Sequence, residues 1–214
     1  MSAEQVELVE QENTSVRRSQ WQMLGVLSAV FVPMVIAYTL FKTQLGIPDG
    51  TINKGELLPV PQQMSELMMS NLDGTPWSAN EMKDKWWMVI PVTADCGESC
   101  QQSLWVTRQV RTRLNEKRIR VKRLALLLDG ANVPEALVEE HPDLAWKRAD
   151  DYQQWSRPQL RPTSGPALLE TAPQRGYFVV DQQGWAMMTY DSRQSGNDLL
   201  KDIKRLLRYS YEKE

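Results

Sequence analysis

The amino-acid sequence predicts an α/β protein in which a mixed β-sheet carries helices on both sides, behind a single N-terminal transmembrane helix. Three observations lead to this fold class. Residues 21–41 form an apolar run without a formal charge. Over residues 86–129 a strand, a loop with two cysteines, a helix and a second strand follow one another, an order that requires a parallel pair of strands. Residues 176–208 then contain two strands joined by a turn and a closing amphipathic helix.

The composition excludes several functional classes. The 214 residues hold 25 Lys and Arg against 27 Asp and Glu, a balance that does not favour general nucleic-acid binding. A hydrophobic content of 42% excludes a disordered chain. Two cysteines and one histidine are too few for a disulfide-rich scaffold, and they cannot fill a four-ligand zinc site without carboxylates or a partner. No nucleophile elbow, P-loop or histidine-based acid–base set supports a hydrolase or a kinase.

Residues 21–41 are long enough to span a bilayer, since 21 residues at about 1.5 Å each cover roughly 30 Å. A signal-peptide core is shorter, so we do not expect cleavage. A buried core helix is the alternative, but the segment lacks a polar stripe. Arg17 and Arg18 precede the span and only Lys42 follows it immediately. The positive-inside rule therefore predicts that residues 1–20 are a cytoplasmic tail. It places the C-terminal domain in the periplasm, at the inner membrane of a bacterium, or in the intermembrane space of a mitochondrion.

Residues 42–64 are rich in glycine and proline and predict an extended tether, with the folded domain at 65–214. Asp73 and Gly74 carry the turn signal of a hairpin, and Ser78 can cap a short helical turn. Residues 86–93 are a nearly continuous run of large and β-branched side chains, which is typical of a strand buried on both faces. Pro91 is the one residue against this strand, because it cannot donate to a ladder.

The second half of the chain completes the fold. After the cysteines, Val106, Val110 and Leu114 recur every four residues and predict an amphipathic helix. The expected elements are a helix from Ser99 or Cys100 to about Lys117, a strand at 121–129, a short helix at 134–140, a short strand at 144–147, a short helix at 151–155, a proline-containing loop at 157–172, strands at 176–181 and 185–190, and a helix capped by Ser195 or Asn197. This order is that of a thioredoxin-like fold.

Cys96 and Cys100 form a C-x₃-C motif where the buried strand leads into the helix. Free amides and the helix dipole at this point stabilise a thiolate at the first cysteine. One helical turn of separation brings the two sulfurs within disulfide reach. Two thiolates can also hold Cu(I) when a third soft or imidazole ligand completes the site. The alternative is a purely structural disulfide, or two unrelated cysteines.

These residues resemble the Sco (SenC-type) family, whose members are membrane-anchored thioredoxin-fold copper chaperones and thiol reductants in cytochrome c oxidase assembly. The resemblance covers about residues 65–210, and it implies that Cys96 and Cys100 act in thiol exchange or bind Cu(I). It also implies a cytochrome c oxidase subunit, or another respiratory-complex protein, as partner. The matching features are the membrane helix at 21–41, the strand at 86–93, Cys96 and Cys100, Asp129 at the end of the next strand, the hairpin at 177–190, and the Gly-Glu-Leu-Leu-Pro stretch at 55–59.

One difference from that family concerns copper. The family's third ligand is a histidine shortly before the strand at 177, where this chain has Ala172, Pro173 or Gln174. We interpret His141, which precedes a proline, as a surface or capping residue. Met187 and Met188 are soft enough to bind Cu(I), but neighbouring strand residues face opposite ways, so at least one is expected in the core.

Two functional hypotheses remain open. In the first, the protein is an assembly factor that handles copper or acts as a thiol–disulfide oxidoreductase, with Cys96 attacking and Cys100 resolving. In the second, it is a structural or interaction subunit of a respiratory membrane complex with a permanent Cys96–Cys100 disulfide. The basic run from Arg108 to Arg123 is either a solvated helix face or a docking surface for an acidic partner or lipid headgroups.

Overall fold

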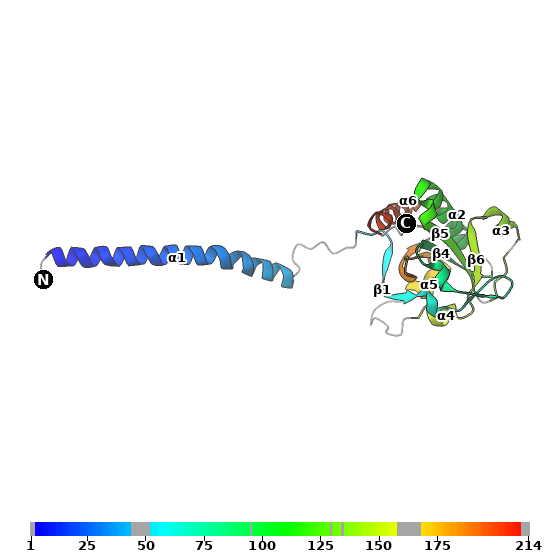
Figure 1. Cartoon of the computed structure of the whole chain (residues 1–214), viewed down its shortest axis with the longest axis horizontal. Coiled ribbons are helices and arrows are strands. Elements are labelled where there is room, and N and C mark those ends of the chain that lie inside the picture. The colour runs from blue at the N-terminus through cyan, green and yellow to red at the C-terminus, as the bar shows by residue number, and fades with distance from the viewer. Residues whose placement is uncertain are drawn as a thin grey trace. The chain divides into compact units, whose positions relative to one another are not determined.

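Figure 1 shows the computed structural model, which describes residues 3–43, 52–94, 96–128, 130–133, 135–157 and 168–210. The chain divides into two compact units, residues 1–51 and residues 52–214. In the first unit, helix α1 (Ala3–Thr43) continues through Pro33. Its stretch Trp21–Thr43 is long and apolar enough to cross a membrane, and its large apolar side chains are exposed. An exposed apolar surface of this length matches a lipid environment better than water.

The second unit is built on one sheet. Among the described residues the sheet has eight strands in the order β1-β8-β7-β4-β5-β6-β2-β3. Strands β4, β5 and β6 are parallel, and the other pairs are antiparallel, so the sheet is mixed. The strands are β1 (Glu56–Gln63), β2 (Met69–Ser70), β3 (Pro76–Trp77), β4 (Trp86–Val92), β5 (Val121–Leu127), β6 (Leu144–Arg148), β7 (Gly176–Val180) and β8 (Trp185–Asp191).

Helices cover both faces of this sheet, and each face has its own apolar core. Side chains of α2 and α6, which lie against each other (Figure 1), pack on one face. Side chains of η1, η2, α4 and α5 pack on the other face. The helices are η1 (Met64–Glu66), η2 (Ala79–Met82), α2 (Glu98–Arg113), η3 (Asn115–Arg120), α3 (Glu135–Glu140), α4 (Tyr152–Trp155), α5 (Leu168–Arg175) and α6 (Gly196–Tyr209). The predicted fold class is therefore confirmed.

The predicted βαβ unit is present and positions the cysteines. All residues of β4 are buried, as expected for a central strand with covered faces. β4 pairs in parallel with β5 from Trp86↔Val121 to Val92↔Leu127, and α2 connects the two strands. Pro91 lies beyond Val89, where the pairing of β4 with β7 ends. No hydrogen bond to β7 is lost at Pro91, which explains why a proline is tolerated in this strand.

The predicted tether at 42–64 differs from the structure in its last part. The compact unit begins at Ile52 rather than at residue 65, and β1 pairs antiparallel with β8 at the edge of the sheet. Pro59 and Pro61 lie within β1. We interpreted them as linker residues, but an edge strand needs no donors along its outer side and therefore tolerates proline.

Two element boundaries also differ from the predictions. Helix α2 ends at Arg113 instead of Lys117, because Asn115 adopts a positive φ of 52° that an α-helix cannot contain. The predicted loop at 157–172 is wrong for residues 168–172, which belong to α5. Leu169 and Ala172 are buried in the core under that face of the sheet. Residues 158–167, like Asp129, lie outside the described residues.

Candidate thiol-disulfide site

The two cysteines lie where β4 ends and α2 begins. A disulfide joins Cys96 to Cys100, and their Cα atoms are 5.1 Å apart. Cys96 precedes the helix, whereas Cys100 lies in its first turn. The structure thus brings the two predicted site residues together at the predicted junction. This spacing lies within the normal range for disulfide-bonded residues.

The two cysteines differ in exposure. Cys100 is 5% exposed and belongs to the core between α2 and the sheet. Cys96 is only partly buried and lies at the margin of that core. The Cys96 backbone has a positive φ of 30°, an uncommon conformation for a residue other than glycine. An incoming thiolate can therefore reach the sulfur of Cys96 more easily than that of Cys100.

The N-terminus of α2 is the main electrostatic feature beside Cys96. Gly97 is the N-cap residue, and no side chain caps its end of the helix. The first-turn amides and the positive end of the helix dipole are therefore available to a negative sulfur. The turn is held by the Cys96 N–H, which donates to the Thr93 carbonyl at 3.1 Å, and by the Gln101 side-chain amide, whose Nε2 donates to the Cys96 carbonyl at 3.3 Å. This arrangement favours the thiolate form of a reduced Cys96.

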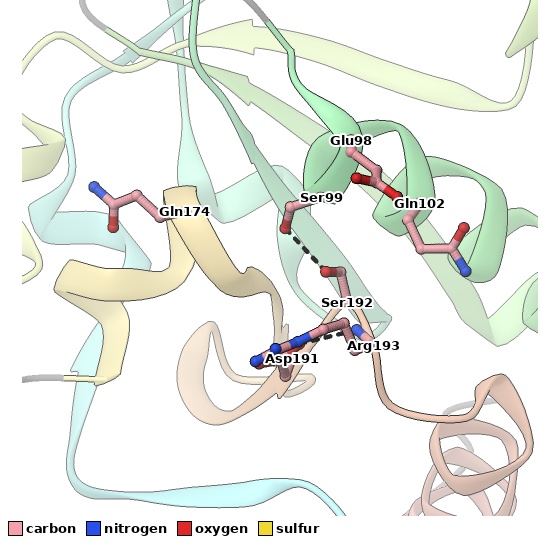
Figure 2. Close-up of a pocket in the computed structure, with 7 residues that line it drawn as sticks. All are labelled: Glu98, Ser99, Gln102, Gln174, Asp191, Ser192 and Arg193. Carbon is pink, nitrogen blue, oxygen red and sulfur yellow. Dashed lines mark hydrogen bonds and ion pairs between the residues drawn. The ribbon is translucent and has the colours of Figure 1, made fainter.

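A pocket of about 410 Å³ lies beside the first turn of α2 (Figure 2). It brings together residues from α2, from α5, from the end of β8 and from the turn after β8. The Ser99 hydroxyl donates to the Ser192 hydroxyl at 3.0 Å and links α2 to that turn. Arg193 pairs with Asp191 at 2.9 Å. The lining residues are Glu98, Ser99, Gln102, Gln174, Asp191, Ser192 and Arg193.

The sequence resemblance implies that the family's third copper ligand corresponds to Ala172, Pro173 or Gln174, and of these Gln174 lines this pocket. Ala172 and Pro173 are buried, whereas Gln174 is exposed and lines the pocket. A glutamine amide is a hard oxygen donor that Cu(I) does not favour. No group of three or more His, Cys, Asp or Glu residues that could hold a metal ion occurs within the described part of the chain. The described residues therefore do not fit a three-ligand copper site formed by this chain alone.

The other candidate ligands are buried elsewhere. Met188 is 0% exposed and its sulfur lies 3.5 Å from the Tyr190 hydroxyl oxygen, which confirms that one of the paired methionines is a core residue. Met187 is partly buried against the same core. His141 is 4% exposed, so its interpretation as a surface residue is wrong. Burial and the nearby Arg123 charge lower the pKa of His141, which therefore remains neutral at neutral pH.

His141 lines a second pocket next to α2, of about 550 Å³. The pocket lies between the outer side of α2, which supplies Gln101 and Trp105, and Leu137 of α3. The imidazole Nδ1 is buried and makes no hydrogen bond. His141 also ends the short helix α3, because its N–H donates to the Val138 carbonyl.

A family model described as a transmembrane-like, thioredoxin-like, C-terminal domain matches residues 86–210. This match covers more than half of the chain and includes both cysteines. The chain belongs to this transmembrane-like, thioredoxin-like family. No curated protein matches it in sequence.

Several solved structures that are similar to this chain are Sco proteins. Copper-bound yeast Sco1 has 11% sequence identity and a TM-score of 0.51, and the match covers 76% of this chain and 97% of that chain. A SCO1/SenC family lipoprotein from Bacillus anthracis has 19% identity and a TM-score of 0.48, with 70% and 99% covered. Apo Sco1 from Thermus thermophilus has 16% identity and a TM-score of 0.48, with 73% and 99% covered. The resemblance predicted from the sequence is thus confirmed for the fold.

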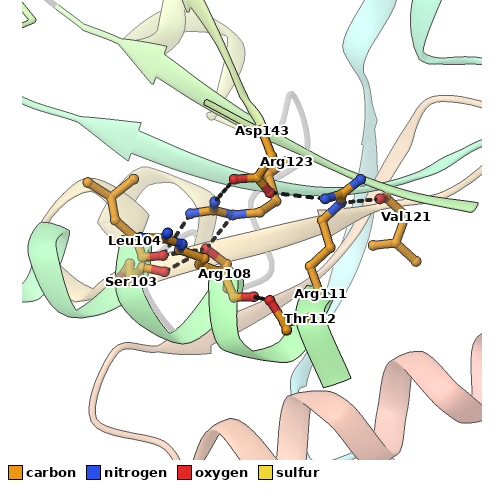
Figure 3. A network of polar contacts seen from close by, with 9 residues as sticks. Ser103, Leu104, Arg108, Arg111, Thr112, Val121, Arg123 and Asp143 are labelled. Atoms are coloured by element: carbon orange, nitrogen blue, oxygen red, sulfur yellow. Dashed lines mark hydrogen bonds and ion pairs between the residues drawn. The ribbon is translucent and has the colours of Figure 1, made fainter. Parts of the chain in front are cut away.

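In this thioredoxin-like domain, α2 is fixed to the sheet by a buried arginine that the sequence analysis missed (Figure 3). Arg123 of β5 is 0% exposed. Its guanidinium donates to Asp143 at 3.0 Å, to the Thr107 hydroxyl at 3.1 Å and to the Leu104 carbonyl at 2.7 Å. Burial lowers the pKa of Arg123 to about 10, while Asp143 acts in the opposite direction. Arg123 therefore keeps its charge at neutral pH.

The basic run that contains Arg123 is thus not uniform. Arg111 donates to Asp143 at 3.2 Å and to the Val121 carbonyl at 2.9 Å, so it belongs to the same network. The period of two along β5 was a usable signal, because it places Arg123 on the same sheet face as the core residues Val121 and Ala125. The interpretation of this run as a solvated face is wrong for Arg123.

Proposed function

We propose that the protein is a membrane-anchored thiol–disulfide exchange protein that assists cytochrome c oxidase assembly by keeping partner cysteines reduced. One observation carries the proposal: Cys96 and Cys100 form a disulfide at an uncapped helix N-terminus, with Cys96 the more exposed of the two. The assembly role rests on the resemblance to the Sco family and on the Sco-like fold. The flanking charges of α1 support an inner-membrane anchor with the domain in the periplasm.

The proposed reaction begins with the dithiol form. The Cys96 thiolate attacks one sulfur of a partner disulfide, which forms a mixed disulfide and releases a partner thiolate that takes up a proton. The Cys100 thiol then loses its proton and its sulfur attacks Cys96, forming the Cys96–Cys100 bond and releasing the second partner thiol. Two electrons pass to the partner, and an external thiol reductant must restore the dithiol. The α2 N-terminus stabilises the Cys96 thiolate that starts the sequence.

A trapping experiment tests the assigned roles. The full chain with Cys100→Ser, solubilised in detergent, is mixed with a synthetic peptide that contains one internal disulfide. We expect a mixed disulfide at Cys96, detected by mass spectrometry, because the resolving thiol is missing. The matched Cys96→Ser variant should trap at least about tenfold less, since Cys100 is 5% exposed. Equal trapping by both variants would contradict the assignment.

The reduction potential separates thiol exchange from a permanent structural bond. An exchanging pair should equilibrate with glutathione or thioredoxin buffers at a potential near about −270 mV or above, whereas structural disulfides lie below about −300 mV. A value below this limit would support the second hypothesis, an interaction subunit of a respiratory complex. The measurement uses the full chain and thiol alkylation at a series of buffer potentials.

Copper handling would require a third donor. The two thiolates alone leave a Cu(I) site incomplete. Of the three positions where the resemblance implies the family histidine, Ala172, Pro173 and Gln174, Gln174 is the exposed one and lines the pocket. We expect the reduced Gln174→His variant to compete with a chromogenic chelator for Cu(I) at least about tenfold better than the unaltered chain. Gln109→His, which changes a residue of α2 outside both pockets, is the control. If the unaltered chain bound Cu(I) as tightly as Gln174→His, the chain would bind copper without an added histidine, and the expected need for a third donor would be wrong.

A further inference from the structure

The exposed side of α6 carries four cations. Lys201, Lys204, Arg205 and Arg208 are all exposed, and their spacing places them on one helix face. The opposite side of the helix, with Leu199, Ile203 and Leu207, is buried in the core. Asp198 pairs weakly with Lys201, at 3.9 Å, at the N-terminal end of this face. The helical repeat thus places the apolar residues of α6 against the sheet and its four cations on the exposed face.

Helix η3 adds two more exposed cations, Lys117 and Arg118, next to the end of α6. Arg120 makes the connection, because its guanidinium donates to the Leu207 carbonyl at 3.1 Å and to the Ser210 hydroxyl at 2.9 Å. We call these six exposed residues the α6 basic surface: Lys117, Arg118, Lys201, Lys204, Arg205 and Arg208. Glu116 is the exposed acidic residue on η3.

Two large apolar side chains accompany these cations. Ile119 is 67% exposed and Tyr209 is 75% exposed, and each follows a member of the α6 basic surface along the chain. Lysine and arginine mixed with exposed aliphatic and aromatic side chains is the composition of segments that lie in a membrane interface. Ile119 and Tyr209 thus add apolar area beside Arg118 and Arg208, their neighbours along the chain.

The chain enters the domain at the same helix. The Lys54 and Gly55 N–H groups donate to the buried Asp202 carboxylate of α6 at 2.7 and 2.9 Å. Gly55 is required there, because a Cβ would lie 2.5 Å from Tyr190 Cζ. Only residues 44–51 separate the end of α1 from Ile52, and a chain of that length spans at most about 30 Å. The segment that enters the domain is therefore hydrogen-bonded to α6, and it follows the candidate membrane helix after only eight residues.

We propose that the α6 basic surface docks on anionic phospholipid headgroups of the membrane that holds α1. Three observations favour a lipid surface as the binding partner: its negative charge complements the cations, Ile119 and Tyr209 are exposed beside them, and the chain enters the domain at Asp202 of α6. The proposal rests on the membrane anchor and is independent of thiol exchange. Removing one cation near an anionic bilayer weakens binding roughly fivefold.

Lysine labelling in nanodiscs tests this contact with the full chain. One set of discs contains phosphatidylcholine alone and the other adds phosphatidylglycerol, so neither lipid competes for an amine-reactive reagent. We expect Lys117 and Lys204 to react at least about fivefold more slowly in the anionic discs. Lys83, an exposed residue outside this surface, should react equally in both. Salt at about 0.5 M, where charges are screened beyond about 4 Å, should remove the protection.

Charge-reversal variants provide the control. Arg205→Glu with Arg208→Glu should abolish the protection of Lys117, whereas Lys83→Glu with Lys85→Glu should leave it intact, and Arg205→Lys with Arg208→Lys should retain it. Equal labelling of Lys117 in the two kinds of disc would overturn the proposal and leave an acidic protein as the occupant. A chain that fails to enter the discs would instead refute the anchor, and the trapping experiment on Cys96 would be unaffected.

Discussion

Arginine residues only a few positions apart along the chain have opposite surroundings in this domain. Arg118 is exposed on η3, whereas Arg123 is fully buried and makes hydrogen bonds to Asp143, Thr107 and the Leu104 carbonyl. A buried charge is tolerated only when it is paired and its donors are satisfied. Arg123 meets both conditions. At this position a basic residue therefore holds α2 against β5 and adds no exposed positive charge to the surface.

The Arg123→Ala variant should be strongly destabilised. The substitution leaves a cavity under α2 and removes a charge partner of Asp143, so we expect the free energy of unfolding to fall by about 3–5 kcal/mol. Lys122→Ala, on the same strand but exposed, should change it by less than about 0.5 kcal/mol. Urea unfolding of the detergent-solubilised full chain, followed by far-UV circular dichroism, measures both. Equal losses in the two variants would contradict the network.

His141 should make the stability of the domain depend on pH. Burial lowers the pKa of the folded imidazole below its ordinary value of 6.5, so the unfolded chain binds more protons as the pH falls through that value. Stability is therefore full above about pH 6.5 and decreases as the pH falls toward 5. The His141→Gln variant should lack this part of the pH dependence. The measurement is the urea midpoint of the unaltered chain and of His141→Gln, each at pH 5 and at pH 7.5. If the midpoint changed equally between the two pH values in both proteins, the prediction would be refuted.

At the scale of elements, periodicity and continuous apolar runs predicted those helices and strands that bury a row of their own apolar residues. The buried strand β4, the helix α2 and the parallel strand β5 follow from local patterns, because each is stabilised by its own row of apolar residues. Strand β1 and helix α5 were missed, since both contain prolines that signal loops. β1 is stabilised by antiparallel pairing with β8. α5 is stabilised by the burial of Leu169 and Ala172 in the core. Such contacts are not visible within a local window.

Hydrogen bonds to Asp202 of α6 hold the segment that leads into β1, so changing Asp202 should affect the start of this strand. The Asp202 carboxylate accepts hydrogen bonds from the Lys54 and Gly55 amides and from the Tyr190 hydroxyl. Asp202→Ala would leave the Gly55 N–H and the Tyr190 hydroxyl, both buried donors, without the carboxylate that accepts from them. We expect a loss of about 3 kcal/mol in the free energy of unfolding. Amide hydrogen exchange of residues 54–58 should accelerate at the same time.

Asp198→Ala is the control for that element, because its carboxylate makes a long ion pair, of 3.9 Å, with the exposed Lys201. We expect it to cost less than about 1 kcal/mol, from the helix dipole and a weak ion pair. Exchange of residues 54–58 should remain slow in this variant. If Asp198→Ala accelerated the exchange as much as Asp202→Ala, the hydrogen bonds to Asp202 would not be what holds the start of β1.

At the scale of the whole molecule, only part of the candidate site could be predicted. Cys96 and Cys100 are four positions apart, so their proximity follows from their short separation where β4 leads into α2. The pocket next to them joins Ser99, Gln174 and Ser192. Their meeting depends on the complete sheet, because the three residues come from segments far apart in the sequence. The burial of His141 likewise depends on how α3 packs beside α2. Local chemistry was predictable from the sequence, whereas the surroundings that modify it were not.

The orientation that we propose for the chain in a membrane rests on few charges, so it should be sensitive to mutation. Arg17 and Arg18 precede the apolar stretch Trp21–Thr43, and Lys42 is the basic residue at its other end. Because lysine and arginine on the two sides decide the orientation, Arg17→Glu with Arg18→Glu leaves the positive charge only after the span. We expect the fraction of chains with the C-terminal domain outside to fall at least about twofold.

Labelling of Cys96 in intact spheroplasts measures that fraction. A membrane-impermeant reductant followed by a membrane-impermeant maleimide modifies only those domains that face outward, and lysed spheroplasts give the total. Glu10→Gln with Glu12→Gln changes the charge of the same segment but should leave the orientation unchanged, since acidic residues contribute little to it. If the arginine variant labelled as completely as the unaltered chain, the flanking arginines would not be what orients the chain. In that case the folding of the domain after translocation, rather than the charge bias, would hold it outside.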